Sequence, residues 1–177
     1  MKNLKNLSAV IILFLLPISQ LAAQEPDVIY VPTSELTVLA MLEMAGVDSS
    51  DIVYDLGSGD GRIVITAAQK FGAKGVGIDI DPKRIKEAKD NAKAAKVADK
   101  VEFIQGDLFQ SDFSEASVVT LYLLSSLNER LRPILMKQLN PGTKIVSHAF
   151  KMGDWEPEKT ETVDGNTIYL WTVPEKE

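Results

Sequence analysis

Short apolar runs alternate with longer helix-like segments along the chain from residue 52 onward. These runs lie at residues 52–56, 75–79, 101–104, 117–123 and 143–150, and the first and fourth are apolar enough for buried strands. Two further strand patterns, at residues 159–163 and 167–173, are joined by the turn Asp164-Gly165-Asn166. The pattern predicts an α/β fold with a Rossmann-like, seven-stranded sheet. The sheet is mostly parallel and ends in a C-terminal antiparallel hairpin.

A first helix is predicted before the sheet begins. It covers residues 35–45, with Thr33 or Ser34 as its N-cap and Gly46 at its end. Two interpretations of this helix remain open. It either forms a lid over a ligand cavity, with Tyr30 and Thr33 facing that cavity, or packs at the edge of the sheet.

Three further helices are predicted between the strands. One begins near Gly61, and the next begins at Asp81-Pro82 and carries a lysine-rich exposed face. That face is most simply explained as a solvated surface with some internal ion pairs. The last helix covers residues 127–139 and includes Pro133, which is unfavourable inside a helix.

Residues 1–23 have the pattern of a targeting segment. Lys2 and Lys5 precede an apolar run at residues 9–16, Pro17 breaks the run, and small residues follow at 21–23. The run is short for a membrane span, which needs about 20 residues. The segment is therefore predicted to be a cleavable signal peptide or an uncleaved membrane anchor. In both cases residues 24–177 form one domain of a bacterial protein, either exported to the periplasm or anchored to the membrane.

Composition excludes several kinds of site. The chain of 177 residues has no cysteine and a single histidine, His148, so it has no disulfide, thiolate metal site or histidine-rich metal site. No metal is predicted. The formal net charge is −6 without a basic stripe, which argues against a nucleic-acid partner.

The candidate chemistry begins at a glycine-rich turn between the first strand and the second helix. Gly57, Gly59 and Gly61 alternate with other residues, so the turn lacks both the Gly-Lys-Ser/Thr ending of a phosphate loop and the Gly-x-Gly-x-x-Gly spacing of a dinucleotide loop. Asp55 and Asp60 would repel a pyrophosphate but suit a ligand with a cationic amino acid end. The stretch Asp-Leu-Gly-Ser-Gly-Asp-Gly resembles motif I of class I S-adenosylmethionine (SAM) methyltransferases. NAD binding is the disfavoured alternative.

Two more acids follow later strands at the same predicted rim of the sheet. Asp79 follows Gly57 by 22 residues, where an acid at the end of the second strand can bind ribose hydroxyls. Asp107 follows the third strand, where it can accept a hydrogen bond from an adenine amino group, with Leu108 or Phe109 packing on the ring. Because ligands of open α/β sheets bind at the carboxyl ends of the strands, these acids indicate one cavity.

A longer series of motifs narrows the resemblance. The motifs are Tyr30-Val31-Pro32-Thr33, the stretch 54–62, Gly77-Ile78-Asp79-Ile80-Asp81-Pro82, Thr120-Leu121-Tyr122-Leu123-Leu124, Leu131-Arg132-Pro133, Pro141-Gly142-Thr143, Val146-Ser147-His148 and Met152-Gly153-Asp154-Trp155. In this order they resemble the protein-lysine methyltransferases whose mitochondrial members modify the c-subunit of ATP synthase and the adenine nucleotide translocase. The resemblance covers about residues 28–173. It implies SAM as the cofactor, bound by Tyr30, Thr33, Asp55, Gly57, Ser58, Gly59, Asp60, Asp79, Ile80, Asp107 and Leu108.

The acceptor site is expected where the fourth and fifth strands end. Tyr122, His148, Asp154 and Trp155 are the candidate catalytic residues, because an aromatic wall can hold an ammonium group and a polar group can orient an amine. Core packing is an equal alternative for Tyr122 and Trp155, and a buried structural histidine is an alternative for His148. The fourth strand does not end in Asn/Asp-Pro-Pro-Tyr, which argues against methylation of DNA adenine or of glutamine.

These patterns together predict SAM-dependent methylation of a protein lysine, on a membrane-associated substrate, by a monomer. The alternatives are a small-molecule or lipid methyltransferase and an exported binding module that has lost catalysis. Export conflicts with the cytoplasmic synthesis of SAM, and the sequence leaves that conflict open.

Overall fold

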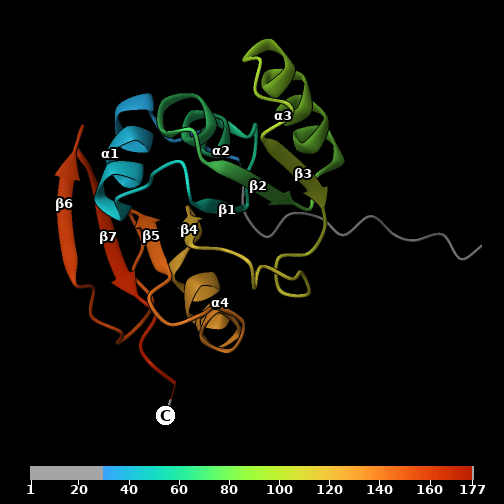
Figure 1. Cartoon of the computed structure of the whole chain (residues 1–177). Coiled ribbons are helices and arrows are strands. Elements are labelled where there is room, and N and C mark those ends of the chain that lie inside the picture. The colour runs from blue at the N-terminus through green and yellow to red at the C-terminus, as the bar shows by residue number, and fades with distance from the viewer. Residues whose placement is uncertain (1–29, 177) are drawn as a thin grey trace, which may run out of the picture.

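Seven strands form one sheet in the computed structural model, which describes residues 30–176 (Figure 1). The order across the sheet is β3-β2-β1-β4-β5-β7-β6. The first five strands pair in parallel, whereas β7 runs antiparallel to both β5 and β6. The predicted seven-stranded α/β sheet with a C-terminal antiparallel hairpin is confirmed. The strands are β1(Ile52–Leu56), β2(Lys74–Asp79), β3(Val101–Gln105), β4(Val118–Leu121), β5(Lys144–His148), β6(Lys159–Val163) and β7(Asn166–Thr172).

Helices cover both faces of the sheet unequally. Figure 1 shows α1(Glu35–Ala45), α2(Arg62–Thr66) and α3(Pro82–Ala94) on one face, and α4(Ser125–Gln138) on the other. A single π-helical turn, η1(Ala67–Phe71), continues α2. Each face has its own apolar core, one centred on Val64 and Met41 and the other on Leu121 and Leu135. The sheet therefore forms the middle layer of three.

Local sequence signals explain where α1 and α3 begin. The Ser34 hydroxyl accepts a hydrogen bond from the Thr37 N–H at the start of α1, and Gly46 ends the helix in the left-handed conformation. Asp81 caps α3 in the same way, with Pro82 in the first turn. Both helices therefore start at the residues that the sequence predicts.

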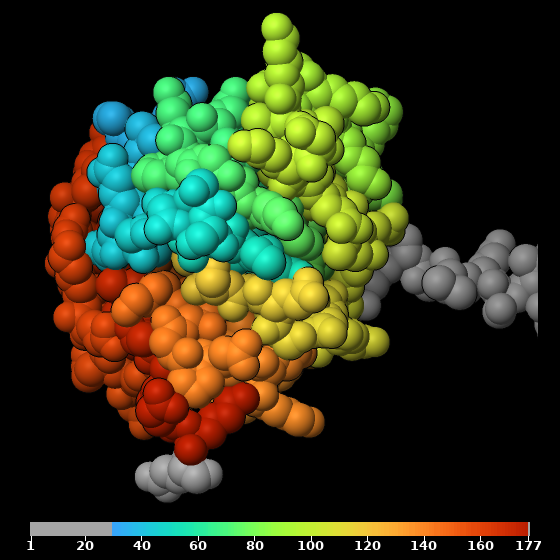
Figure 2. Space-filling model, in the orientation of Figure 1, coloured from blue at the N-terminus to red at the C-terminus, as the bar shows by residue number. Residues whose placement is uncertain are grey.

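The start of α1 is tied to the far end of the chain. The Ser34 hydroxyl donates to an Asp164 carboxylate oxygen, and the Asn166 amide donates to the Thr37 hydroxyl. Figures 1 and 2 show α1 beside the strands β6 and β7, although more than 100 residues separate them. These contacts place residues 30–34 across the carboxyl ends of the central strands.

Two predicted elements have different ends in the structure. The strand predicted at 117–123 stops at Leu121, and α4 starts at Ser125 rather than at residue 127. Pro133 lies inside α4, where it and Glu129 four residues earlier are both exposed. Water can therefore satisfy the carbonyl group that has lost its N–H partner, so the proline is tolerated.

The strand predicted at 143–150 ends at His148 because Ala149 takes φ 65°. The segment predicted at residues 1–23 lies outside the described residues. Within residues 30–176, the helices are too short or too polar to cross a membrane.

Candidate active site

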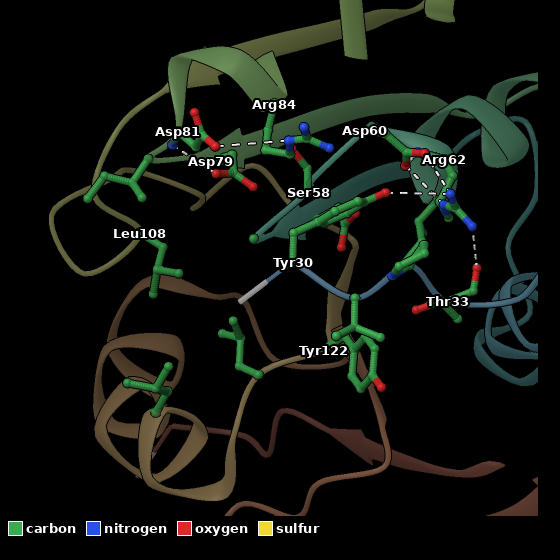
Figure 3. Close-up of a pocket in the computed structure, with 18 of the residues that line it drawn as sticks. Tyr30, Thr33, Ser58, Asp60, Arg62, Asp79, Asp81, Arg84, Leu108 and Tyr122 are labelled. Carbon is green, nitrogen blue, oxygen red and sulfur yellow. Dashed lines mark hydrogen bonds and ion pairs between the residues drawn. The ribbon is translucent and has the colours of Figure 1, made fainter. Parts of the chain in front are cut away.

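A cavity of about 480 Å³ lies at the carboxyl ends of the first four strands. This volume is within the range typical of small-molecule sites. Figure 3 shows the side chains that surround it. The lining residues are Tyr30–Thr33, Asp55, Gly57, Ser58, Asp60, Arg62, Ile63, Asp79–Asp81, Arg84, Gly106–Phe109, Tyr122, Leu123 and Leu127. All of the predicted cofactor residues are among them except Gly59, which lies in the same loop.

The glycine loop needs its glycines. Gly57, Gly59 and Gly61 have φ of 91°, 53° and 80°, a region that other residues enter only at a cost. The loop is anchored on β2, because the N–H groups of Gly57 and Ser58 both donate to the Ile78 carbonyl, at 2.8 and 3.0 Å. A Cβ atom on Gly59 would lie 2.3 Å from the Tyr30 ring. The loop can therefore lie directly beneath an aromatic side chain.

Asp79 connects the glycine loop to the end of β2. One carboxylate oxygen accepts a hydrogen bond from the Gly59 N–H at 2.8 Å, and the other accepts one from the Asp81 N–H at 2.9 Å. Each oxygen keeps a second lone pair, so the carboxylate can still accept hydrogen bonds from a ligand diol. Asp79 lines the cavity together with Ile80.

Asp55 is a buried acid with one polar side-chain partner. Its side chain accepts a hydrogen bond from the Thr120 hydroxyl at 2.8 Å, and the residue is only 3% exposed. Burial raises the pKa of Asp55 to about 7, and the charges of Asp79 and Asp60 add to this effect. A cationic ligand group in the cavity would favour the ionised carboxylate. The site therefore fits the ammonium end of an amino acid.

Asp60 forms a two-pronged ion pair with Arg62. The Arg62 Nε donates to one carboxylate oxygen at 2.9 Å, and an Nη donates to the other at 2.7 Å. Burial opposes ionisation of Asp60, but the hydrogen bonds and charge of Arg62 outweigh it and lower the pKa of this carboxyl group. Asp60 therefore stays ionised, whereas Asp55 titrates near neutral pH.

The β3–β4 connection forms the far end of the cavity. The Asp107 carboxylate accepts hydrogen bonds from the Phe109 N–H and the Gln110 side chain, both at 2.9 Å, which folds the connection into a tight turn. Leu108 and Phe109 both line the cavity, and the Arg130 guanidinium lies 3.7 Å from the centre of the Phe109 ring. This end offers acceptor oxygens beside an apolar wall, as an adenine ring requires.

Tyr122 and His148 meet at the opposite end. Tyr122 lines the cavity and stacks on His148, with the two ring centres 3.8 Å apart. The His148 Nδ1 shares a hydrogen bond of 3.1 Å with the Thr33 hydroxyl, whereas its Nε2 is buried without a partner among the described residues. Burial lowers the pKa of His148, so the imidazole is neutral at pH 7. His148 itself does not line the cavity.

The structure places Asp154 and Trp155 away from this cluster. The Asp154 carboxylate is 93% exposed and pairs with Arg132 on α4. Trp155 packs at a tilt against Trp171, and its carbonyl accepts a hydrogen bond from the Trp171 indole. Neither residue lines the cavity, because the loop after β5 leads them back over the face that α4 covers.

Two arginines that line the cavity have no role in the sequence-based prediction. The pattern of α3 predicts a solvated position for Arg84, yet its side chain is only 16% exposed and lies 4.7 Å from the centre of the Tyr30 ring. Arg62 enters the motifs only as the end of the glycine stretch. The sequence did contain one indication of a role for Arg62. A cation in the first turn of a helix opposes the helix dipole, so an arginine there suggests a specific contact.

Comparisons with known proteins agree with this geometry. The family described as the ANTKMT methyltransferase domain matches residues 55–159. A protein-lysine N-methyltransferase of Saccharolobus islandicus is 48% identical over 155 residues, which are 85% of this chain and 96% of that protein. The lysine N-methyltransferase of the ATP synthase c-subunit from Xenopus laevis is 30% identical over 144 residues, which are 81% of this chain and 63% of that protein.

A solved structure is more similar still. It is described as an RNA methyltransferase from Salinibacter ruber in complex with S-adenosyl-L-homocysteine, and it is 61% identical to this chain. The TM-score is 0.82, and the match covers 83% of this chain and 96% of that one. S-adenosylhomocysteine is what remains of SAM after methyl transfer. The cofactor of this chain is SAM, the resemblance seen in its motifs is confirmed, and the chain belongs to the ANTKMT methyltransferase domain family.

Proposed function

We propose that this enzyme transfers the methyl group of SAM to the side-chain amine of a lysine in a protein substrate. The observation that carries the proposal is the arrangement of the cavity. Acids line its cofactor end, and the Tyr122 ring, which stacks on His148 behind it, lies at the other end. Two relatives support the acceptor, because both are named as lysine N-methyltransferases.

The lining of the cavity supports a proposed set of cofactor residues. Asp79 would hold the ribose hydroxyls, and Asp107 the adenine amino group, with Ile80 and Leu108 beside the ring. Asp55 and the loop residues 57–60 would hold the methionine end, where the buried Asp55 carboxyl group would balance the ammonium charge. Tyr30 covers the loop, and Thr33 closes the side toward the acceptor. Bound there, SAM supplies an activated methyl group on a sulfonium.

The acceptor amine must lose a proton to solvent before its nitrogen lone pair can attack the methyl group. An unperturbed lysine has a pKa of about 10.4, and partial desolvation lowers it. The Tyr122 ring would hold the incoming ammonium group by a cation–π contact and align the amine with the methyl group. His148 does not line the cavity, and its Nδ1 is bonded to Thr33, so we assign it the support of Tyr122 from behind and not the role of base. Asp154 and Trp155 lie outside this arrangement, and we give them no part in the transfer.

We propose further that the substrate is associated with a membrane and that the enzyme is exported or membrane-anchored. The apolar run at residues 9–16 supports this location. The Xenopus relative is named for a lysine of the ATP synthase c-subunit, which gives the proposal a precedent within the family.

RNA is the second candidate acceptor, because the structure from Salinibacter ruber is described as an RNA methyltransferase. The net charge of −6 and the acids around the cavity disfavour a polyanion. Protein lysine therefore remains the better-supported acceptor.

A labelling experiment separates the two acceptors. The full chain is incubated with methyl-tritiated SAM and with membrane and soluble extracts of cells that lack it, and Asp79→Ala serves as the inactive control. The proposal predicts label in the membrane fraction. Protease should remove this label, RNase should not, and hydrolysis should release it as methyl-lysine. Label that only RNase or lipid extraction removes would overturn the proposal.

A further inference from the structure

Arg62 occupies a position that its own helix does not favour. It is the first residue of α2, where the helix dipole opposes a positive charge. The helix itself therefore does not explain an arginine at this position, so we look for the explanation in the contacts of its side chain. Besides the ion pair with Asp60, one Nη donates to the Thr33 carbonyl at 2.7 Å, and the other lies 3.5 Å from the Tyr30 hydroxyl. Figure 3 shows this fan of contacts from Arg62.

Residues 30–33, the lead-in segment, have few other attachments to the cavity wall. The Tyr30 ring lies over Gly59, with the Arg84 guanidinium 4.7 Å from its centre. Tyr30 and Val31 are both exposed, so little apolar burial holds this part of the segment in place. The Arg62 contacts are thus the main polar restraint that joins the segment to the glycine loop.

A chain of contacts leads from Arg62 to the acceptor end of the cavity. Arg62 binds the Thr33 carbonyl, and the buried Thr33 hydroxyl bonds to the His148 Nδ1 at 3.1 Å. His148 in turn stacks on Tyr122, with 3.8 Å between the ring centres. The same guanidinium also holds Asp60 in the cofactor loop. One side chain therefore touches elements on both sides of the cavity.

We propose that Arg62 is a positioning residue that fixes the lead-in segment over the glycine loop and, through Thr33, sets His148 and Tyr122 relative to the cofactor. The inference rests on the cofactor half of the proposed function and does not depend on the identity of the acceptor. A planar guanidinium can hold the two Asp60 oxygens and the Thr33 carbonyl at once. A lysine ammonium at the same position can keep the charge but not this geometry.

The test uses the only histidine of the chain as its reporter. The untagged full chain, Arg62→Ala, Arg62→Lys and Lys89→Ala are compared by imidazole ¹⁵N NMR and by calorimetric titration with S-adenosylhomocysteine. Lys89 is the matched control, because it is an exposed cation on the neighbouring α3. Circular dichroism verifies the fold of each variant. Arg62→Lys carries the test if Arg62→Ala does not fold.

Both Arg62 variants are expected to shift the His148 signals and to weaken S-adenosylhomocysteine binding, at least tenfold in Arg62→Ala and less in Arg62→Lys. Lys89→Ala should change neither. Folded Arg62 variants with wild-type His148 signals, or with wild-type affinity, would overturn the inference while leaving the proposed function intact. Failure of the wild-type chain to bind would overturn both.

Discussion

Asp55 carries the strongest electrostatic constraint among the described residues of the cavity. Its carboxyl group is buried against Thr120, and its pKa is raised to about 7. Without the cofactor, the folded state holds a proton there that the unfolded chain releases near pH 4. The contribution of this group to the stability of the folded state is therefore fully present below about pH 4 and is lost as pH rises through about 7. A cationic cofactor group reverses the preference, because it stabilises the ionised form.

We expect cofactor binding to weaken in acid because of Asp55. Between pH 7 and pH 5.5 the ionised fraction of a group with a pKa of about 7 falls roughly 15-fold, so the affinity for S-adenosylhomocysteine should fall by about the same factor. The amino group of the ligand stays protonated over this range. Calorimetric titration at the two pH values measures the change.

Asp55→Asn is the control for this pH dependence. It should bind more weakly than the wild type at pH 7 and show little further loss at pH 5.5. An unchanged wild-type affinity, or an equal loss in Asp55→Asn, would show that Asp55 is not the titrating group.

At the scale of single elements, the glycine loop combines a backbone requirement with a packing requirement. Gly61 has φ 80°, and a Cβ atom there would lie 2.6 Å from the Phe103 ring in the core beneath α3. Gly142, in the turn before β5, has φ 87° with no atom within 4 Å of the corresponding position. An alanine at either position would strain the backbone, but only an alanine at position 61 would also clash with a neighbouring side chain.

Substituting both glycines with alanine separates these two effects. Gly142→Ala should cost about 1–2 kcal/mol, the strain of a left-handed alanine. Gly61→Ala should cost about 1–3 kcal/mol more, because the added methyl group overpacks the core. Urea unfolding of both variants measures the difference. Equal losses would mean that Phe103 moves aside freely and that the loop does not depend on close packing.

Element boundaries were predictable where a local signal decides them. The strand at 52–56 and the helix at 35–45 have the predicted ends, because Ser34 and Gly46 cap the helix and the glycine turn ends the strand. The start of α4 was wrong by two residues, because Leu124 lacks the capping side chain that would have indicated it. The end of β5 depends on the positive φ of Ala149, which alanine does not signal.

At the scale of the whole molecule, the predicted rim of acids exists because parallel strands bring their carboxyl ends together. Asp55, Asp79 and Asp107 lie at or just beyond the carboxyl ends of three adjacent strands, so the topology that the sequence pattern implies already brings them together. The partners of Arg62 were not predictable in this way. Its contact with Thr33 joins residues 29 positions apart, and it depends on how α1 packs across the sheet.

The position predicted for Trp155 was wrong. Its place in the sequence, soon after β5, suggested the acceptor end of the cavity. The loop instead carries it to Trp171 on β7, where its ring joins the aromatic packing on the α4 side of the sheet. Sequence order fixes which strand end a loop leaves, but not the face toward which a loop of several residues turns.

The monomeric state and the location of the N-terminal segment stay predictions.

The central claim is that SAM binds in the cavity through Asp79, and calorimetric titration of the full chain with S-adenosylhomocysteine tests it most directly. Asp79→Asn retains the size of the side chain but loses its charge and one acceptor oxygen, and Asp99→Ala removes an exposed acid between α3 and β3 as the control. We expect the wild type and Asp99→Ala to bind S-adenosylhomocysteine and not to bind NAD. Asp79→Asn should lose at least tenfold in S-adenosylhomocysteine affinity. Wild-type affinity in a folded Asp79→Asn variant would contradict the claim.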